Sequence, residues 1–342
     1  MKKILLIVLI MSSTSLVLRA QSPAQKLRLA RSTFEQGRLH ELPILLENLQ
    51  NFSESEKVDA YKLLTQAYIY LEEPEKADET MLKLLQTDHY FEVNDAVDPA
   101  EFVALYKTFR TTPIYRFGVK LGSNITQPNV LNYNPVNSGT STYKYQFGFN
   151  AAATAEIPMP FLNNRLTLNP ELGFIIKSFS YQGEVLDYSE LVASQTTGTE
   201  SQKWITLPVS LQYRLKENRL NPYVAIGVSA DYLISSSITA EQKRPGNQAV
   251  ELRSFDANPL RERLNMNLTA SAGMKTKISG GFLTAELRVY YGLRKINSSK
   301  TLFDNQYLAY DYQYIDGIYK LNSISITVGY IYNIFNPVKL KN

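Results

Sequence analysis

The sequence contains no cysteine and only two histidines among its 342 residues. The lack of cysteine excludes disulfide bonds and a lipid anchor attached through cysteine. His40 and His89 both precede residue 113, and two histidines without cysteine do not suggest a zinc site. We therefore expect no cofactor and no metal.

Long apolar runs are also missing. After the first 20 residues no run reaches the roughly 18 apolar residues that indicate a transmembrane helix. Lys2 and Lys3 precede the short apolar run 4–11, and the segment ends at Ala20, which is typical of a secretory signal peptide. The alternative, an N-terminal membrane anchor, is less favoured because the serine-rich run 12–15 interrupts the apolar segment. We predict a signal peptide over 1–20.

Dense blocks of like charge are absent, and the formal net charge is only +4. This excludes an extended basic surface for nucleic acid. Aromatic residues are present but unevenly chosen, with 23 tyrosines and one tryptophan. An excess of tyrosine is expected where rings lie at a membrane–water boundary.

Residues 21–112 are predicted to form a helical domain. Ser22 and Gln25 make a capping box with Pro23 at the first helical position, and Gly37 ends that helix. A second helix is predicted from the helical spacing of Leu42, Leu45, Leu49 and Phe52. Further helices are predicted to begin at Ser53 with Glu56, at Pro74, and at the capping segment 98–101.

These helices are predicted to pair as two tetratricopeptide-like hairpins. Phe34 and Tyr68 lie 34 residues apart, which is the period of that repeat, although Pro43 occupies a position where the repeat has a small residue. The domain could be a compact helical spacer. It could also form a concave surface that holds a protein partner.

After residue 113 the apolar pattern changes to a period of two. Ile205 to Leu215, Leu264 to Met274 and Leu283 to Leu293 alternate apolar with polar residues over ten or more positions. Such segments suit tilted membrane strands, whereas strands of a soluble sandwich are about 5–6 residues long. Eight strands are predicted at 114–126, 143–158, 165–181, 202–215, 222–240, 261–278, 281–297 and 319–335.

The predicted connections alternate in length. Those at 160–164, 216–221 and 280–281 are short, whereas those at 127–142, 182–201, 241–260 and 298–318 are long and polar. This sorting is typical of outer-membrane barrels. The fold class is therefore α+β: a helical domain over 21–112, followed over 113–342 by an eight-stranded antiparallel transmembrane β-barrel. The helices are expected in the periplasm and the long loops outside the cell.

The last strand carries a candidate assembly signal. Its polar, glycine, aromatic and apolar positions are Thr327, Gly329, Tyr332 and Ile334, although the chain continues for eight residues instead of ending in an aromatic. Tyr330, Tyr332 and Phe335 are predicted to join an aromatic girdle at the periplasmic boundary.

The inward positions of the strands are unusually rich in charge for a narrow lumen. Mixed charges there are expected to pair, because an unpaired buried charge is costly. A salt-bridged plug is favoured over an ion-conducting pore, and no histidine is available for catalysis in the barrel. We therefore predict a non-catalytic protein whose lumen network contains Arg116, Lys120, Glu156, Glu171, Arg214, Asp231, Lys275, Glu286 and Arg288, together with Lys277.

Tyr310, Tyr312 and Tyr314 alternate with other residues in the last long loop. They could form an extracellular recognition surface, since tyrosine supplies contact area at low entropic cost. The favoured interpretation is that two strands extend beyond the bilayer and carry these aromatics at their rim.

The segment 115–124, YRFGVKLGSN, resembles the first strand of outer-membrane barrel domains common in Bacteroidota, which include the PorT-like proteins of type IX secretion. The resemblance implies an envelope location and a non-catalytic role in a larger complex. The leading hypothesis is a structural or adaptor subunit of protein secretion or outer-membrane protein assembly. Its expected partners are outer-membrane lipid and an envelope protein docked by the helices. The alternative is a barrel that binds or transports small solutes or glycans, and an envelope enzyme using Glu171 or Glu286 is the least favoured.

Overall fold

The computed structural model describes residues 22–132, 141–159, 162, 165–186, 192–216, 220–244, 249–278, 280–298, 300–301 and 303–340. These residues form two compact units, which divide between Thr112 and Pro113 and again between Ile334 and Phe335. The predicted signal peptide lies outside the described residues. The segment that follows Ile334 belongs to the first unit, although the sequence pattern had assigned it to the barrel domain.

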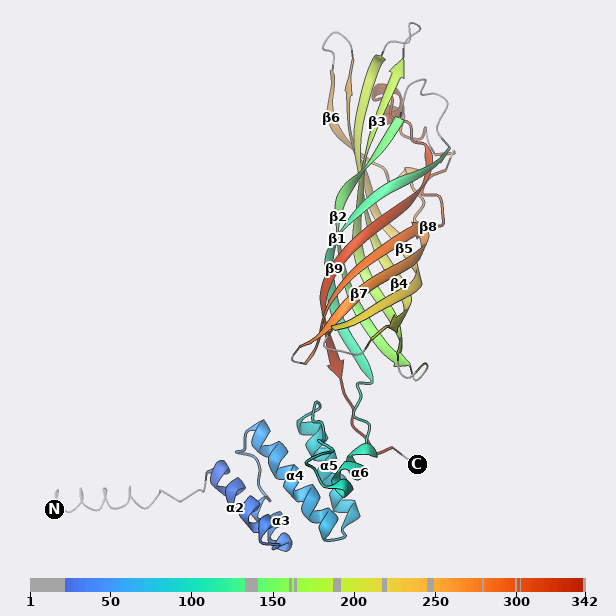
Figure 1. Cartoon of the computed structure of the whole chain (residues 1–342). Coiled ribbons are helices and arrows are strands. Elements are labelled where there is room, and N and C mark those ends of the chain that lie inside the picture. Colours follow the sequence, from blue (N-terminus) through green and yellow to red (C-terminus); the bar gives the residue numbers. More distant parts are fainter. Residues whose placement is uncertain are drawn as a thin grey trace, which may run out of the picture. The chain divides into compact units, whose positions relative to one another are not determined.

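The first unit is helical (Figure 1). Its elements are α2 (Pro23–Glu35), η1 (Leu39–Glu41), α3 (Leu42–Leu45), α4 (Glu54–Tyr70), α5 (Pro74–Thr87) and α6 (Ala100–Lys107). Both predicted capping boxes are confirmed. The side chains of Ser22 and Ser53 accept hydrogen bonds from the third amide of their helices. In return the side chains of Gln25 and Glu56 accept hydrogen bonds from the backbone amides of Ser22 and Ser53. Gly37 follows α2 with φ at 73°, a backbone conformation that glycine adopts without strain.

Two helical predictions are wrong in detail. The predicted second helix is reduced to α3, because Asn48 Oδ1 accepts a hydrogen bond from the Gln50 amide at 3.1 Å and so stabilises a turn instead. Within the described residues only α4 and α5 therefore form a complete helical hairpin, and the two predicted tetratricopeptide-like hairpins are not observed there. Asp98 does not cap α6; its carboxylate accepts from the Asn94 amide and pairs with Lys62. None of the described helices is long and apolar enough to span a bilayer.

Residues 335–340 complete the helical unit. The Leu340 amide donates to the Thr108 carbonyl at 2.8 Å, and the Arg110 amide donates to the Val338 carbonyl at 3.0 Å. Phe335 stacks on His89 with ring centroids 5.3 Å apart. The prediction that Phe335 belongs to the barrel's aromatic girdle is therefore wrong.

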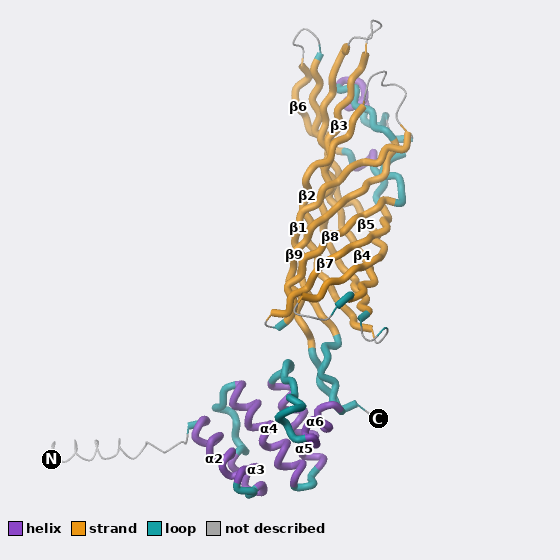
Figure 2. Tube along the Cα trace, in the orientation of Figure 1, coloured by secondary structure: helices purple, strands orange, loops and turns teal. Residues whose placement is uncertain are grey.

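The second unit is one antiparallel sheet closed into a ring (Figures 1 and 2). Its strands are β1 (Tyr115–Asn132), β2 (Ser141–Met159), β3 (Leu166–Leu186), β4 (Val192–Arg214), β5 (Leu220–Lys243), β6 (Ala249–Asp256), β7 (Leu264–Ile278), β8 (Gly281–Gly292) and β9 (Ile318–Ile334). The ring runs β1-β2-β3-β4-β5-β7-β8-β9 and closes where β9 pairs with β1. We call the end that carries Tyr115 and Ile334 the near rim, and the opposite end the far rim.

The sheet has nine strands instead of the eight predicted. The additional strand, β6, pairs only with residues 237–243 of β5, beyond the closed ring. The predicted long connections at 127–142 and 182–201 are also wrong, since much of both is strand. Thus β5 is 24 residues long, whereas a tilted membrane strand needs about 9–11 residues. The strands continue past the bilayer at the far rim.

The two faces of the barrel differ in chemistry, as the alternation predicts. Along β7 the outward residues Leu264, Met266, Leu268 and Met274 are about half exposed, whereas the inward Asn265 and Asn267 are buried. Equivalent outward apolar residues occur on β4, β5, β8 and β9. An apolar exterior around a polar interior is the arrangement that suits a lipid environment.

Candidate functional site

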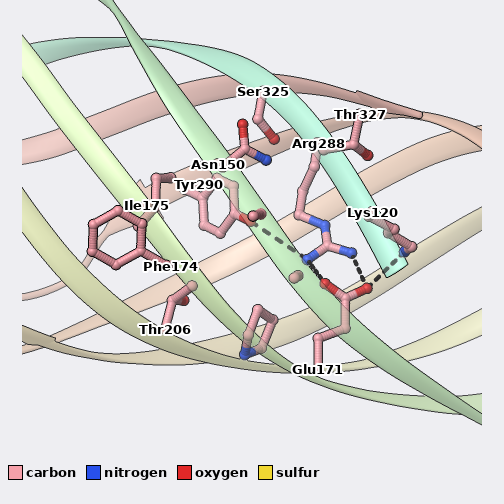
Figure 3. Close-up of a pocket in the computed structure, with 13 residues that line it drawn as sticks. Lys120, Asn150, Glu171, Phe174, Ile175, Thr206, Arg288, Tyr290, Ser325 and Thr327 are labelled. Carbon is pink, nitrogen blue, oxygen red and sulfur yellow. Dashed lines mark hydrogen bonds and ion pairs between the residues drawn. The ribbon is translucent and has the colours of Figure 1, made fainter. Parts of the chain in front are cut away.

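The middle of the lumen holds a compact cluster of four charged side chains, which we call the central cluster: Lys120, Glu171, Glu286 and Arg288. Lys120 Nζ lies 2.7 Å from Glu171 Oε1 and 3.0 Å from Glu286 Oε2. Arg288 holds Glu171 through two hydrogen bonds of 2.7 and 2.8 Å (Figure 3). Arg288 also contacts Glu286. The cluster joins β1, β3 and β8 across the lumen, and its two positive and two negative charges balance.

A second group of charges lies between the central cluster and the near rim. Glu156 pairs with Lys275 and, at 3.3 Å, with Arg116 Nη1. Lys275 also donates to Gln212 Oε1 at 2.9 Å. Arg214 lines the same small cavity as Arg116, Gln212 and Lys275, whereas Lys277, which has the same strand parity as Lys275, is exposed at the near-rim end of β7.

On the far side of the central cluster, Lys177 pairs with Asp231 at 2.8 Å. The Asp231 carboxylate also accepts from Thr206 and Asn267, so its oxygens are well satisfied. The predicted network contained Asp231 but omitted Lys177. The signal was present in the sequence, because Lys177 and Glu171 have the same parity on β3 and so face the same side.

A third group, at the far rim, was not predicted. Arg261 makes two hydrogen bonds to Glu200, of 2.7 and 2.6 Å, and lies 2.6 Å from Asp316. All three side chains are almost completely buried. Burial, together with the neighbouring Glu200 charge, raises the pKa of Asp316 even though Arg261 opposes that shift. These residues come from three segments predicted as loops or loop edges, so no strand pattern related them.

The last long connection packs against this far-rim group. Tyr312 and Tyr314 are buried with Tyr181, Phe255 and Leu260, and Tyr312 donates to the Glu251 carbonyl at 2.8 Å. Residues 307–311 form a π-helical turn, η3, instead of a strand extension. Tyr310 is 70% exposed, so of the three tyrosines predicted as a recognition loop it alone has its side chain largely available.

The lumen leaves little free volume. The cavity beside the central cluster measures about 20 Å³, and the one beside Glu156 and Lys275 about 30 Å³. A cavity needs roughly 10–15 Å³ of such volume to hold one water. Each of these spaces therefore has room for one or two waters, and neither is large enough for a solute.

The helical unit contains a much larger groove of about 750 Å³ between α3, α4 and α5. Its apolar lining includes Leu46, Leu49, Leu64 and two partly buried tyrosines, Tyr61 and Tyr68. Three lysines along it are paired with glutamates, and Lys76 Nζ also lies 5.5 Å above the Tyr68 ring. We call this feature the helical groove.

Both histidines of the chain lie in the helical unit. His89 Nδ1 is bonded to the Leu85 carbonyl and its ring stacks on Phe335, while His40 lies in η1. Within the described residues no group of three His, Asp or Glu side chains is placed to hold a metal ion. The predicted assembly-signal residues are divided by strand alternation: Tyr332 and Ile334 face outward, while Thr327 is buried toward the lumen.

Comparison with known proteins agrees with the barrel architecture. A family model described as an outer membrane protein beta-barrel domain matches residues 114–298. Among solved structures, the chain is similar to Neisserial surface protein A at 11% identity and a TM-score of 0.32, covering 64% of this chain and 97% of that one. It is also similar to a major outer membrane protein from Thermus thermophilus at 12% identity and a TM-score of 0.32, covering 64% and 99%. No curated protein matches the chain.

Proposed function

The chain belongs to this family of outer-membrane β-barrel proteins, and on that premise we propose that its barrel is a closed anchor whose helical unit docks a protein partner. The protein acts without catalysis, as a structural or adaptor subunit of an envelope complex. The observation that carries the proposal is the charge-filled lumen, in which the central cluster crosses the barrel and the cavities beside it and beside Lys275 are water-sized.

The charge balance of the lumen supports an anchor over a pore. A conducting channel needs a continuous wet path and charges that face it, as in barrels wide enough to leave an aqueous channel. Here Lys120 and Arg288 both donate hydrogen bonds to Glu171, and each of the three residues is no more than 6% exposed. Moving an ion past them would require breaking at least one buried ion pair.

The helical groove supports the docking role. It combines an apolar floor with a rim of lysine–glutamate pairs, which is the composition of a site for an extended or helical protein segment. Its volume falls within the range of binding clefts, whereas the two lumen cavities fall far below that range. Binding is therefore assigned to the helices and anchoring to the barrel.

The topology supports a proposed orientation. Since the near rim carries short turns and both ends of the sheet, we place it and the helical unit on the periplasmic side, with the far rim outside the cell. The resemblance of residues 115–124 to PorT-like first strands makes protein secretion the first machinery to test, followed by barrel assembly. Thr327, Gly329, Tyr332 and Ile334 stay the candidate assembly signal.

The docking role is tested by purifying the protein from native membranes with a Tyr68→Ala variant. Tyr68 lines the groove, and Tyr70, on the same helix and 48% exposed outside it, provides the matched control variant Tyr70→Ala. We expect a stoichiometric companion protein with the wild type and with Tyr70→Ala, and its loss with Tyr68→Ala. Recovery of the wild type with no companion would contradict the adaptor role.

The closed lumen is tested separately by reconstituting the protein in a planar bilayer. We expect no steady current at moderate voltage. A stable conductance would instead favour the alternative function, a barrel that transports small solutes.

A further inference from the structure

A group of basic residues lies at one edge of the apolar exterior, on the β7–β8 side of the far rim. On β7 the outward apolar residues run from Leu264 to Met274. Along β8 they run from Leu283 to Leu293, which directly follows the last residue of the strand. Ten residues at about 3.3 Å each, tilted by about 40°, span roughly 25 Å along the barrel axis, which equals the usual height of the lipid-facing band. At the far-rim side, the lipid-facing band therefore ends between Arg263 and Leu264 at the start of β7, and just after Leu293 beyond β8.

The residues at that boundary line a cleft of about 270 Å³. Arg263 and Arg294 are exposed in the cleft, and Lys295 is the exposed neighbour of Arg294 in the chain. Glu262 contributes one carboxylate, so these exposed side chains leave a net positive charge. Leu264 forms the wall that continues into the lipid-facing surface and is 55% exposed.

The exposed cations of the cleft are not neutralised by acidic side chains of the described residues. Within the described part of the chain, Arg263, Arg294 and Lys295 form no ion pair, and Arg263 makes only a 3.4 Å contact to the Tyr232 hydroxyl. Arg261, which lies behind them, is committed to Glu200 and Asp316. Arg261 also lines the cleft, and its guanidinium is held in place by both carboxylates and by the Leu260 carbonyl.

We propose that this cleft binds the phosphate-bearing headgroup of an anionic membrane lipid. A guanidinium offers paired N–H donors that match phosphate oxygens, and two exposed guanidiniums line this cleft. A soluble anion would gain only those contacts. A lipid gains them together with acyl-chain contact along Leu264, Met266 and Leu268, which begin where the cleft ends. This inference depends on the barrel spanning a membrane and not on the adaptor role.

The test is native mass spectrometry of the purified, folded protein in an uncharged detergent. Phosphatidic acid is added as the probe, and phosphatidylcholine with the same acyl chains is added in parallel. The Arg263→Gln/Arg294→Gln variant removes the two cleft guanidiniums. Lys144→Gln/Lys243→Gln is the matched control, because it removes two exposed positive charges from β2 and β5, outside the cleft.

We expect phosphatidic acid adducts on the wild type and on the control. Association with the arginine variant should be at least about tenfold weaker, because the variant loses the charged hydrogen bonds from both guanidiniums. Equal binding by the arginine variant, or equal binding of phosphatidylcholine, would overturn the proposal. Full displacement of the lipid by millimolar inorganic phosphate would also overturn it, by identifying a site for soluble anions. If the double variant does not fold, Arg294→Gln alone gives the same comparison, because no contact of its side chain supports the fold within the described residues.

Discussion

The central cluster predicts a specific response to the loss of one charge. Lys120 Nζ contacts Glu171 and Glu286 at 2.7 and 3.0 Å, and the residue is 2% exposed. The substitution Lys120→Met keeps the volume similar but leaves two buried carboxylates with Arg288 alone. Breaking a buried ion pair by removing one partner costs about 3–5 kcal/mol, and we expect Lys120→Met to lower the free energy of unfolding by that amount.

The measurement is urea unfolding of the protein from lipid vesicles, followed by tryptophan fluorescence. Trp204 is the single tryptophan of the chain and is completely buried inside the barrel, so its emission reports the loss of the lumen directly. With a urea dependence of about 2 kcal/mol per molar, a loss of 3–5 kcal/mol moves the midpoint down by about 1.5–2.5 M.

Two further variants decide whether charge balance is the cause. Lys120→Met combined with Glu286→Gln restores neutrality in the cluster, and the glutamine can still accept the 2.7 Å hydrogen bond from Tyr223. We expect this double variant to be more stable than Lys120→Met alone, with a coupling of at least about 1 kcal/mol. Lys144→Met, which removes an exposed lysine on β2, should leave the midpoint unchanged. A wild-type midpoint for Lys120→Met, or strictly additive effects, would refute the reasoning.

Other features give shorter predictions. Burial opposes ionisation of Asp98, but hydrogen bonds from the Lys62 ammonium and the Asn94 amide hold its pKa below the usual 3.8. A lowered folded-state pKa stabilises the fold above the unfolded-state pKa, and this stabilisation is lost as pH falls through the folded-state pKa. Below about pH 4 the protection of the α6 amides from hydrogen exchange, taken relative to the intrinsic rate at each pH, should therefore fall. Asp98→Asn should remove that acid-dependent change, and an unchanged response would contradict the assignment. At Gly122 a Cβ would lie 2.0 Å from the Ile326 carbonyl oxygen, so Gly122→Val should prevent β1 from pairing with β9. The compact band of the folded barrel in unheated gel electrophoresis should then disappear. Ser123→Val is the control and is expected to fold, because residue 123 on the same strand already carries a β-carbon. Arg261→Met should leave Glu200 and Asp316 buried without their cation and loosen residues 305–317, seen as faster proteolysis at the far rim, and wild-type protease resistance would argue against this.

The parts of the fold that could be predicted are those where one physical rule acts alone. Inside the bilayer each strand residue faces either lipid or lumen, so alternation along β7 assigned both faces correctly. Parity likewise placed Lys120, Glu171 and Glu286 in one lumen, although it could not show which of them pair. That information resides in the register between strands, such as Lys120 opposite Gly329 on one side and Ala152 on the other.

Beyond the bilayer the alternation of lipid-facing and lumen-facing residues no longer applies, and the strand predictions there are less accurate. The outer parts of β3 and β4 are rich in Ser, Thr and Gln and have no lipid on one side, so their sequence resembled loops. The strand β6 was missed because it is stabilised by pairing with β5 and by the packing of Phe255 against Tyr312, neither of which leaves a periodic pattern. The group formed by Glu200, Arg261 and Asp316 depends on that same packing.

Because segment 335–340 belongs to the helical unit, that unit can be completed only after the barrel strands have been synthesised. All nine strands are synthesised after α6 and before the residues that pair with Thr108 and Arg110 and stack on His89. During export the helices therefore cross first, and the surface formed by His89, Thr108 and Arg110 stays uncovered until the last strand has followed. A partner that recognises the finished helical unit would thereby select chains whose barrel sequence has been delivered in full.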